Sequence, residues 1–368
     1  MSIPSISFSK NHNVEFYKTL QQRVREYFKD TRKSRFANAN MVIKTIFMIA
    51  LYVVPFVLLL TVVENAWISF LMWLIMGFGM AGIGLSIMHD ANHGAYSKSK
   101  YVNKAMGFII FAVGGSDVNW RIQHNILHHT YTNVSGMDED INPGKVMRFS
   151  PHAKRYKMHR YQHIYAWFLY CLMTLMWCTV KDYKQAIRYN KLDLMKTQDI
   201  TFGQLLTSII ISKILYFAVI FGLPFAFSAL PWWATILGFL AMQFIAGLIL
   251  AMIFQPAHVV PTSNYPVPDE SGNIDADWAV SQLFNTANFA PKAKLFSWYV
   301  GGLNYQIEHH LFPNICHVHY DKIAKIVKQT TAEFNLPYIS QKTWYGALRE
   351  HTIMLKKLGN NDFAPGIH

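Results

Sequence analysis

The stretch MVIKTIFMIALYVVPFVLLLTVV, residues 41–63, contains about 23 consecutive residues that are almost all apolar. A helix needs roughly 20 such residues to cross the hydrocarbon core of a bilayer. Three further runs repeat the pattern, at Ala66–Met88, Leu205–Ala229 and Trp232–Phe254. We therefore predict four transmembrane helices, arranged as two hairpins with short connectors.

The composition agrees with a membrane protein that has a large aqueous part. The 368 residues are 52% hydrophobic and 15% aromatic, and 15% are charged, against about 25% in soluble domains. The four runs cover only part of the chain, so the remainder must lie in water. The expected fold class is an all-α integral membrane protein with an extramembrane helical cap.

The net charge of +13 is distributed unevenly along the chain. No Lys or Arg falls in Glu64–Asn65 or Ser228–Pro231, the connectors of the two hairpins. These basic residues crowd into segments 10–44, 98–121, 145–160, 181–196 and 292–357. Loops rich in Lys and Arg face the cytoplasm, where anionic lipid attracts them. We expect the cap to be cytoplasmic and the partner to be membrane lipid, with no role for nucleic acid.

These arguments divide the chain into five segments. The expected segments are a cytoplasmic amphipathic N-terminal segment (1–40), a first transmembrane hairpin (41–88), a cytoplasmic cap (89–204), a second hairpin (205–255) and a second part of the cap (256–368). Helical spacing of apolar residues predicts helices at 14–28, 321–334 and 341–358, the first of them lying in the membrane interface.

Two features test this topology. Residues 164–180 are apolar but number only about 17, the lower limit for a span. A crossing there would place the Lys-rich C-terminal part outside, so we expect an interfacial helix. Lys213 lies within the third apolar run, and we expect its side chain to snorkel toward the cytoplasmic face.

Two other patterns receive structural interpretations. The glycines of GFGMAGIG, residues 77–84, lie inside an apolar run, where small residues allow close helix packing. Cys171, Cys178 and Cys316 have no metal-site or disulfide spacing, and we expect buried or interfacial thiols.

Eight of the 16 histidines fall into four groups beside the apolar runs. Residues three or four apart on a helix share one face, so two imidazoles can reach one metal ion. A single histidine at a helix end is usually structural, but four groups on one membrane face predict a metal site. The eight histidines are His89 and His93, then His124, His128 and His129, then His258, and finally His309 and His310.

The choice of metal follows from the ligand set. Imidazole suits Zn, Cu, Fe and Ni, and a zinc site uses three or four protein ligands. Eight imidazoles are too many for one ion, and the groups contain none of the Met or Cys that favour copper. Two irons are therefore the favoured interpretation.

Carboxylates close to the histidines are candidate hydrogen-bond partners. A metal-bound histidine usually donates its other N–H to a carboxylate, a carbonyl or water. Asp90 and Asp140 are the candidates for this role, although solvated surface acids are an equally good interpretation. Glu308, Asp138 and Glu139 also lie near the histidines.

Four motifs occur together in a recognisable order: HDANHGAYS (89–97), WRIQHNILHHTYTN (120–133), DEDI (138–141) and QIEHHLFP (306–313). With the C-terminal runs YDKIAKIVKQ and LREHTIMLKKLG, they make the chain resemble the membrane fatty acid desaturases over nearly its whole length. At the position of Gln306 many desaturases have histidine, whereas the front-end branch has glutamine. In this feature the chain resembles the front-end branch. That branch adds a cis double bond between an existing one and the carboxyl end, typically giving delta-5, delta-6 or delta-8 products.

The resemblance implies that the eight histidines bind two irons, with O2 as co-substrate. His258 rests on a short motif and on its depth in the membrane. Gln306 is expected to hydrogen-bond a bound water or to shape the substrate channel, and His317 and His319 are expected to be solvated or to support ligands.

The substrate implied is an acyl-CoA or an acyl-lipid. The sequence contains no HPGG haem motif of a fused b5-type cytochrome. Bacterial members of the family that it resembles commonly lack this domain. Electrons would come from a separate ferredoxin or cytochrome b5-type donor, steered by a basic face at Lys154, Arg155 and Lys157. The expected location is multi-pass in a bacterial inner membrane, with the active site on the cytoplasmic side.

Two alternatives remain open from the residues themselves. The same site in a di-iron hydroxylase would add oxygen to an alkyl chain or sphingoid base. A non-enzymatic membrane metal or haem protein is a different class. Haem ligation would need paired histidines inside the spans, and a transporter would need ionisable residues near the bilayer midplane.

Overall fold

The computed structural model describes residues 6–9 and 14–363, which form two compact units. The first unit contains Ala39–Ile122 and Trp167–Met252, and the second contains Gln123–Ala166 with the described parts of 3–38 and 253–368. Almost all regular structure is helical. The described strands are two short parallel pairs, β1 (Ser7–Phe8) with β2 (Asn273–Ile274) and β3 (Asn288–Phe289) with β4 (Ser340–Gln341).

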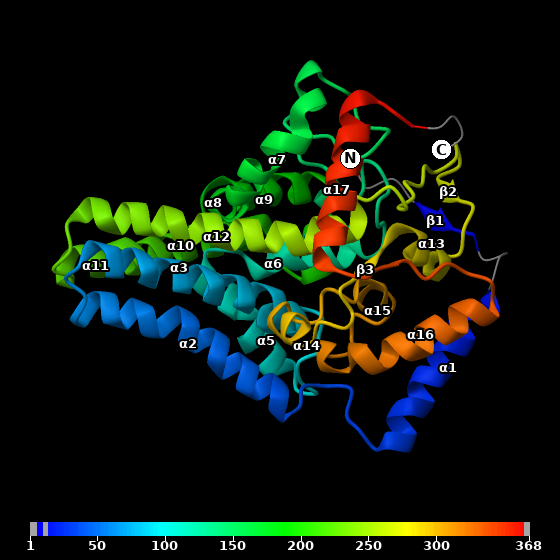
Figure 1. The fold of residues 1–368 in the computed structure, drawn as a ribbon, viewed down its shortest axis with the longest axis horizontal. Coiled ribbons are helices and arrows are strands. Elements are labelled where there is room, and N and C mark those ends of the chain that lie inside the picture. Colours follow the sequence, from blue (N-terminus) through cyan, green and yellow to red (C-terminus); the bar gives the residue numbers. More distant parts are fainter. Residues whose placement is uncertain (1–5, 10–13, 364–368) are drawn as a thin grey trace. The chain divides into compact units, whose positions relative to one another are not determined.

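The first unit begins with two long apolar helices that run side by side (Figure 1). They are α2 (Ala39–Thr61) and α3 (Ala66–Gly82). Asn65 starts α3 because its side chain accepts hydrogen bonds from the backbone N–H groups of Trp67 and Ile68, which would otherwise lack acceptors. The π-helical turn η1 (Ile83–Met88) and the short α4 (His89–Asn92) continue α3 without a break.

Glycines allow the close packing expected of residues 77–84. A Cβ atom on Gly79 would lie 2.7 Å from the backbone nitrogen of Tyr52 on α2. One on Gly77 would overlap the Ile245 side chain and lie 2.9 Å from the backbone carbonyl oxygen of Met242. Only glycine fits where these backbones approach, which is the interhelical packing role predicted for the motif.

The second pair of long helices is also present. The third long apolar helix consists of α10 (Phe202–Phe217), η8 (Ala218–Gly222) and α11 (Leu223–Phe227) in sequence, and the fourth is α12 (Trp232–His258). A reciprocal pair of hydrogen bonds between Thr201 and Gln204 caps the first of them. By length and composition, four described helices are able to cross a membrane. The four apolar helices expected from the sequence are therefore confirmed.

The apolar segment at 164–180 is broken rather than continuous. It forms α7 (Gln162–Cys171), α8 (Met173–Met176) and the π-turn η6 (Trp177–Lys181), which leads into α9 (Asp182–Lys191). The axis bends by 57° between the parts before and after Leu172. A bend of this size is compatible with a broken span or a re-entrant segment, so its interfacial position stays a prediction.

Lys213 does not snorkel, and this expectation was wrong. Its side chain is buried, and its ammonium forms an ion pair with Asp182 and donates to the backbone carbonyls of Gly114 and Trp177. Four shorter elements complete the first unit: α5 (Lys100–Phe108), η2 (Ile109–Val113), α6 (Asp117–Trp120) and η7 (Leu194–Gln198).

The second unit has its own hydrophobic core. The N-terminal helix α1 (Val14–Thr31) lies beside α16 (Tyr320–Glu333) in Figure 1. Its buried face is formed by Phe16, Leu20 and Val24, which pack against protein side chains. The helix predicted at 14–28 is therefore present, with its apolar face in the core of this unit.

The other elements of the second unit are short, apart from the C-terminal helix. The predicted C-terminal helices are confirmed as α16 and α17 (Trp344–Asn360). The remainder are η4 (Glu139–Ile141), η5 (Lys157–Tyr161), α13 (Trp278–Asn285), α14 (Lys294–Tyr299), α15 (Gln306–Leu311) and η9 (His317–His319).

Cys171, Cys178 and Cys316 are free thiols. The last two are buried and Cys171 is half-buried. This agrees with the expectation of structural thiols rather than a disulfide framework.

Candidate metal centre

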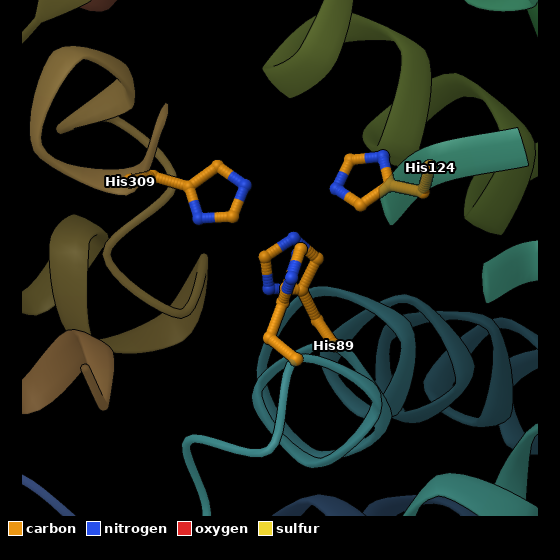
Figure 2. Close-up of side chains that lie close together, drawn as sticks. His89, His124 and His309 are labelled. Atoms are coloured by element: carbon orange, nitrogen blue, oxygen red, sulfur yellow. The ribbon is translucent and has the colours of Figure 1, made fainter. Parts of the chain in front are cut away.

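The first histidine pair lies at the end of the second long helix, within the first unit. His89 is the first residue of α4 and His93 follows its last residue. Their ring centroids are 4.8 Å apart, and each ring is 5.5 Å from the ring of Trp120. Figure 2 shows His89 extending from its helix. The carboxylate of Asp90 lies 3.7 Å from Nδ1 of His89, which is beyond hydrogen-bond distance.

The second group is carried by η3 (Arg121–His128), which has π-helical rather than α-helical geometry. The backbone N–H of His129 donates to the carbonyl of His124, five residues earlier, at 3.0 Å. The wider turn aligns His129 with His124, whereas an α-helix would place residues five apart about 140° from each other around its axis. Single π-turns of this kind occur often at functional sites.

The third group explains why two histidines stand side by side in QIEHHLFP. Adjacent residues on a helix point in different directions, and the two rings of α15 contact overlapping sets of histidines. The ring of His309 is 4.6 Å from that of His129. The ring of His310 is 4.9 Å from those of His128 and His258, and it stacks on the ring of His129 at 4.4 Å. The pair therefore contributes to two clusters within the second unit.

The first cluster is His128, His258 and His310, whose candidate ligand atoms lie within 4.8 Å of one another. All three rings are completely buried. Their Nε2 atoms have no hydrogen-bond partner among the described residues. Three unpaired nitrogens converging in a buried site are costly unless a metal ion or ordered water binds them, so this cluster fits a metal ion.

The far side of each ring in this cluster is held in place. Nδ1 of His128 lies 3.0 Å from the Asp138 carboxylate. Nδ1 of His258 lies 3.3 Å from the carbonyl of Asn285, and Nδ1 of His310 lies 2.8 Å from Oε1 of Gln282. Each partner is an acceptor, so each Nδ1 carries the proton and each Nε2 keeps its lone pair for a metal.

The second cluster is His124, His129 and His309. Nε2 of His129 lies 3.3 Å from Nε2 of His124 and 3.0 Å from Nε2 of His309. Two imidazole nitrogens bound at about 2.1 Å to one ion, at a right angle, are about 3.0 Å apart. Figure 2 shows the rings of His124 and His309 turned toward a common space. This cluster also fits a metal ion.

Burial and neighbouring charges act in opposite directions on the pKa values of two of these rings, His310 and His128. Burial and the neighbouring histidines lower the pKa of His310 far below its usual value, so the ring stays neutral. Burial opposes protonation of His128, but the Asp138 carboxylate outweighs it and raises the pKa of His128. The neutral His128 ring keeps its one proton on Nδ1, which faces Asp138, so a second proton would occupy Nε2. Binding of a metal requires neutral imidazole and would displace that second proton.

Glu308, the residue beside the histidine pair, is a buried carboxyl group with a raised pKa. Glu308 is completely buried, and its carboxylate accepts hydrogen bonds from Asn288 at 2.8 Å and from the Tyr338 hydroxyl at 2.9 Å. Burial raises the pKa of Glu308 to about 7. Since Asn288 also accepts from the backbone N–H of Ile307, this group fixes the position of α15.

Gln306 is buried in the same helix. Its amide nitrogen donates to the carbonyl of Leu303 at 2.8 Å. Its Oε1 has no partner among the described residues, and the amide lies beside His258. An unpaired oxygen in this position can accept a hydrogen bond from a bound water.

The carboxylates after the second histidine group differ in their contacts. Asp138, which the sequence did not single out, is the closest to His128. Asp140 lies 3.7 Å from Nδ1 of both His124 and His128, and it accepts a hydrogen bond from Gln123. His317 and His319 are buried rather than solvated, and His319 lies 3.2 Å from the carbonyl of Phe36.

Sequence reasoning missed one element altogether. Helix α13 carries no histidine, yet Trp278, Gln282 and Asn285 contact the histidine segments. The available signal was a polar or amphipathic residue at positions i, i+4 and i+7 of a helix that is otherwise largely apolar.

With this geometry established, comparison with known proteins defines the class of protein. Residues 65–342 match the fatty acid desaturase family. A sn-1 linoleoyl-lipid 6-desaturase of Arthrospira platensis is 35% identical, over 97% of this chain and 95% of that protein. The enzyme of the same name from Synechocystis is 33% identical, covering 94% and 95%. An acyl-lipid (8-3)-desaturase of Physcomitrium patens is 35% identical, covering 98% and 75%.

The chain therefore belongs to the fatty acid desaturase family, in its front-end branch. It is an oxidoreductase that desaturates fatty acyl chains. The resemblance stated from the histidine motifs is confirmed. Neither hydroxylation nor a non-enzymatic metal or haem role is favoured by these relatives.

Proposed function

We propose that this desaturase inserts a cis double bond into a lipid-linked acyl chain, on the carboxyl side of an existing double bond, at a two-iron site. The reaction converts CH2–CH2 to CH=CH while O2, two electrons and two protons become two water molecules. The observation that carries the proposal is the convergence of buried histidines in the second unit, at His128, His258 and His310 and at His124, His129 and His309, in a chain of the desaturase family.

The proposed iron ligands are the eight histidines of the sequence motifs. Six belong to the two clusters, and His89 with His93 would complete the set. The six histidines would give each of two irons three protein nitrogens. The first pair, whose rings are adjacent, would add two more ligands. Bound iron would supply activation of O2 and removal of hydrogen from an unactivated methylene, which side chains alone do not achieve.

The chain's own residues have three tasks in this mechanism. Asp138, Gln282 and the carbonyl of Asn285 hold protons on Nδ1 atoms, so that the Nε2 lone pairs face inward. Glu308 and Asn288 hold α15 in place. Burial of all these groups keeps bulk water away from the oxidising site, which limits side reactions.

The acyl carrier is proposed to be a glycerolipid rather than CoA. Both cyanobacterial relatives are named for a linoleoyl chain at the sn-1 position of a lipid, and the moss relative is named for an acyl-lipid. Gln306 in the third motif supports carboxyl-side insertion. We propose that its free Oε1 accepts a hydrogen bond from a water at the site.

The membrane arrangement is proposed from the four long apolar helices and the distribution of Lys and Arg. It has four spans, a cytoplasmic cap and a multi-pass location in a bacterial inner membrane. Electrons would come from a separate ferredoxin or cytochrome b5-type protein. The basic residues at 154–157 are the proposed docking point.

The deciding experiment is expression in a bacterium of defined lipid composition, fed with linoleate. Gas chromatography with mass spectrometry should reveal a fatty acid lacking two hydrogens, with its new double bond nearer the carboxyl end. Separation of lipid classes should place that product in glycerolipid before it appears in any CoA pool. A product that gains oxygen, or a bond added on the methyl side, would contradict the proposal.

Replacement of His309 by alanine tests the ligand assignment, and replacement of His152 is its matched control. The variant should lose both the product and bound iron, as measured by elemental analysis of purified protein. His152 is a suitable comparison, because its Nε2 lies 3.1 Å from the carbonyl of Tyr265, outside both clusters. His152→Ala should keep its iron. Full activity in His309→Ala would overturn the ligand assignment.

A further inference from the structure

We infer that Gln282 on α13 is a positioning residue that fixes the tautomer of His310 and thereby sets the iron affinity of the cluster formed by His128, His258 and His310. This inference rests on the proposed iron site and adds a residue that no histidine motif contains. Helix α13 (Trp278–Asn285) contributes no metal ligand of its own.

The orientation of the Gln282 amide follows from its surroundings. Its Nε2 lies 3.4 Å from the carbonyl oxygen of His129, which can only accept a hydrogen bond. The amide nitrogen must therefore face that carbonyl. If the amide were reversed, two oxygens would face each other with no proton between them. Oε1 consequently points to the opposite side, toward Thr132 and His310.

The protonation of His310 follows in turn. Nδ1 of His310 is 2.8 Å from Oε1 of Gln282, and that oxygen is purely an acceptor. Nδ1 must carry the ring proton. The neutral ring has only one proton, so Nε2 is left with the lone pair that a metal requires. The backbone carbonyl of His129 thus determines, through Gln282, that His310 coordinates a metal through Nε2.

The same helix face holds two other histidine segments. Trp278 donates from its indole nitrogen to the carbonyl of His129 at 3.2 Å. Asn285 donates to the carbonyl of Thr132 at 2.8 Å, and its own carbonyl lies 3.3 Å from Nδ1 of His258. Residues 278, 282 and 285 are spaced to share one side of a helix. Gln282 stands in the middle of this side.

The opposite face of α13 fixes the helix itself. Ala279, Val280 and Leu283 are buried in the core cluster that includes residues of α1 and α16. The Asp277 side chain caps the first turn by accepting from the N–H groups of residues 279 and 280. Because apolar packing and a helix cap anchor α13, rather than the histidine rings, Gln282 is held in place before a metal binds. Such preorganisation strengthens metal binding.

The test compares purified Gln282→Met and Gln282→Glu with the wild-type protein in iron binding. Apoprotein is titrated with Fe(II) against a competing chelator, without substrate or electron donor. Methionine keeps the volume but removes the acceptor, and we expect iron affinity to fall roughly 10- to 100-fold. Glutamate, as a neutral carboxyl, offers a hydroxyl donor to the His129 carbonyl and an oxygen acceptor to Nδ1, and we expect it to recover at least about tenfold over methionine.

A spectroscopic readout separates positioning from general damage. Co(II) added alone should give a ligand-field absorption spectrum that is similar in wild type and Gln282→Glu and altered in Gln282→Met. Thr286→Val is the matched control, because the Thr286 hydroxyl donates only to the carbonyl of residue 282 in its own helix. It should lower thermal stability while keeping wild-type iron affinity.

The outcomes are distinguishable. If Gln282→Met binds iron as tightly as wild type, or Gln282→Glu binds as weakly as Gln282→Met, the inference is wrong. Loss of iron in Thr286→Val to the same extent as in Gln282→Met would also overturn it, because destabilisation alone would then suffice. If the wild-type protein itself fails to bind two irons, the proposed function has failed.

Discussion

Lys213 and Asp182 form an ion pair inside the first unit, with Nζ 2.6 Å from Oδ2 and both side chains buried. The ammonium also donates to the carbonyls of Gly114 and Trp177. Asn119 in turn donates to the backbone carbonyl of Asp182 at 2.9 Å. The pair therefore joins the third long helix to the segment around the 57° bend.

Removal of one member of this pair should destabilise the protein strongly. Breaking a buried ion pair leaves an uncompensated charge and costs about 3–5 kcal/mol. We expect Lys213→Met or Asp182→Asn to lower the thermal unfolding midpoint markedly in detergent-purified protein. The double substitution should recover much of the loss, since no charge then remains buried.

The exposed pair of Lys196 with Asp193 is the control for this experiment. Its nitrogen and oxygen are also 2.6 Å apart, but both side chains are largely exposed. Water and salt screen such pairs, so Lys196→Met should change the midpoint little. Strictly additive losses in the Lys213/Asp182 double variant would show that the two side chains do not depend on each other.

Asp138 and Asp140 offer a second prediction, because only one closely contacts His128. Asp138 is completely buried, and its carboxylate lies 3.0 Å from Nδ1 of His128. The carboxylate also accepts hydrogen bonds from the backbone N–H groups of Asn133 and Asp140. Loss of a ligand's hydrogen-bond partner typically costs 10- to 100-fold in metal affinity. Asp138→Asn should therefore reduce iron affinity by about this factor, measured by chelator competition.

Asp140→Asn should have a smaller effect on iron affinity. Its carboxylate is 3.7 Å from the nearest histidine nitrogens and is partly exposed. Equal losses in the two variants would refute the ranking of the carboxylates. A larger loss in Asp140→Asn would restore the assignment made from the sequence.

These cases show which parts of the structure could be predicted. The four apolar helices and the grouping of histidines follow from local patterns, since bilayer thickness and helical spacing act within one segment. The π-turn that aligns His124 with His129 could not be predicted, because the α-helical spacing of three or four residues does not pair residues five apart. The burial of Lys213 and the role of Gln282 depend on partners distant in sequence. Residue type alone identifies no such partner.

His351 predicts a loss of stability in mild acid. The ring is buried, with Nδ1 donating to the Val259 carbonyl at 2.8 Å, and burial lowers its pKa to about 4. The unfolded chain takes up a proton near pH 6.5 whereas the folded protein does not. Stability from this residue is therefore complete above pH 6.5 and is lost as the pH falls toward 4.

The measurement is the pH dependence of the unfolding midpoint in wild type and His351→Leu. Between pH 7.5 and pH 5 we expect His351 to account for a loss of about 1–2 kcal/mol. The leucine variant should show a correspondingly shallower decline, although it loses the hydrogen bond to Val259. Parallel curves for the two proteins would show that this histidine titrates normally in the fold.

The last prediction concerns the proposed electron donor. Lys154 and Lys157 are exposed, whereas Arg155 donates from Nε to the carbonyl of Gly359 at 2.6 Å. Arg155 is therefore left unchanged, because its loss would disturb the contact with α17. Reversal of charge at an encounter surface slows association with an acidic partner. Lys154→Glu combined with Lys157→Glu should raise the apparent KM for reduced donor while kcat stays near wild type.

A second double reversal, Lys325→Glu with Lys328→Glu, supplies the same change of net charge on the exposed face of α16. It should leave the KM for the donor near the wild-type value. The KM increase at 154 and 157 should also shrink as ionic strength rises, because salt screens attraction between exposed charges over about 10 Å at 0.1 M. An unchanged KM in the first variant, or an equal rise in both, would place the docking surface elsewhere.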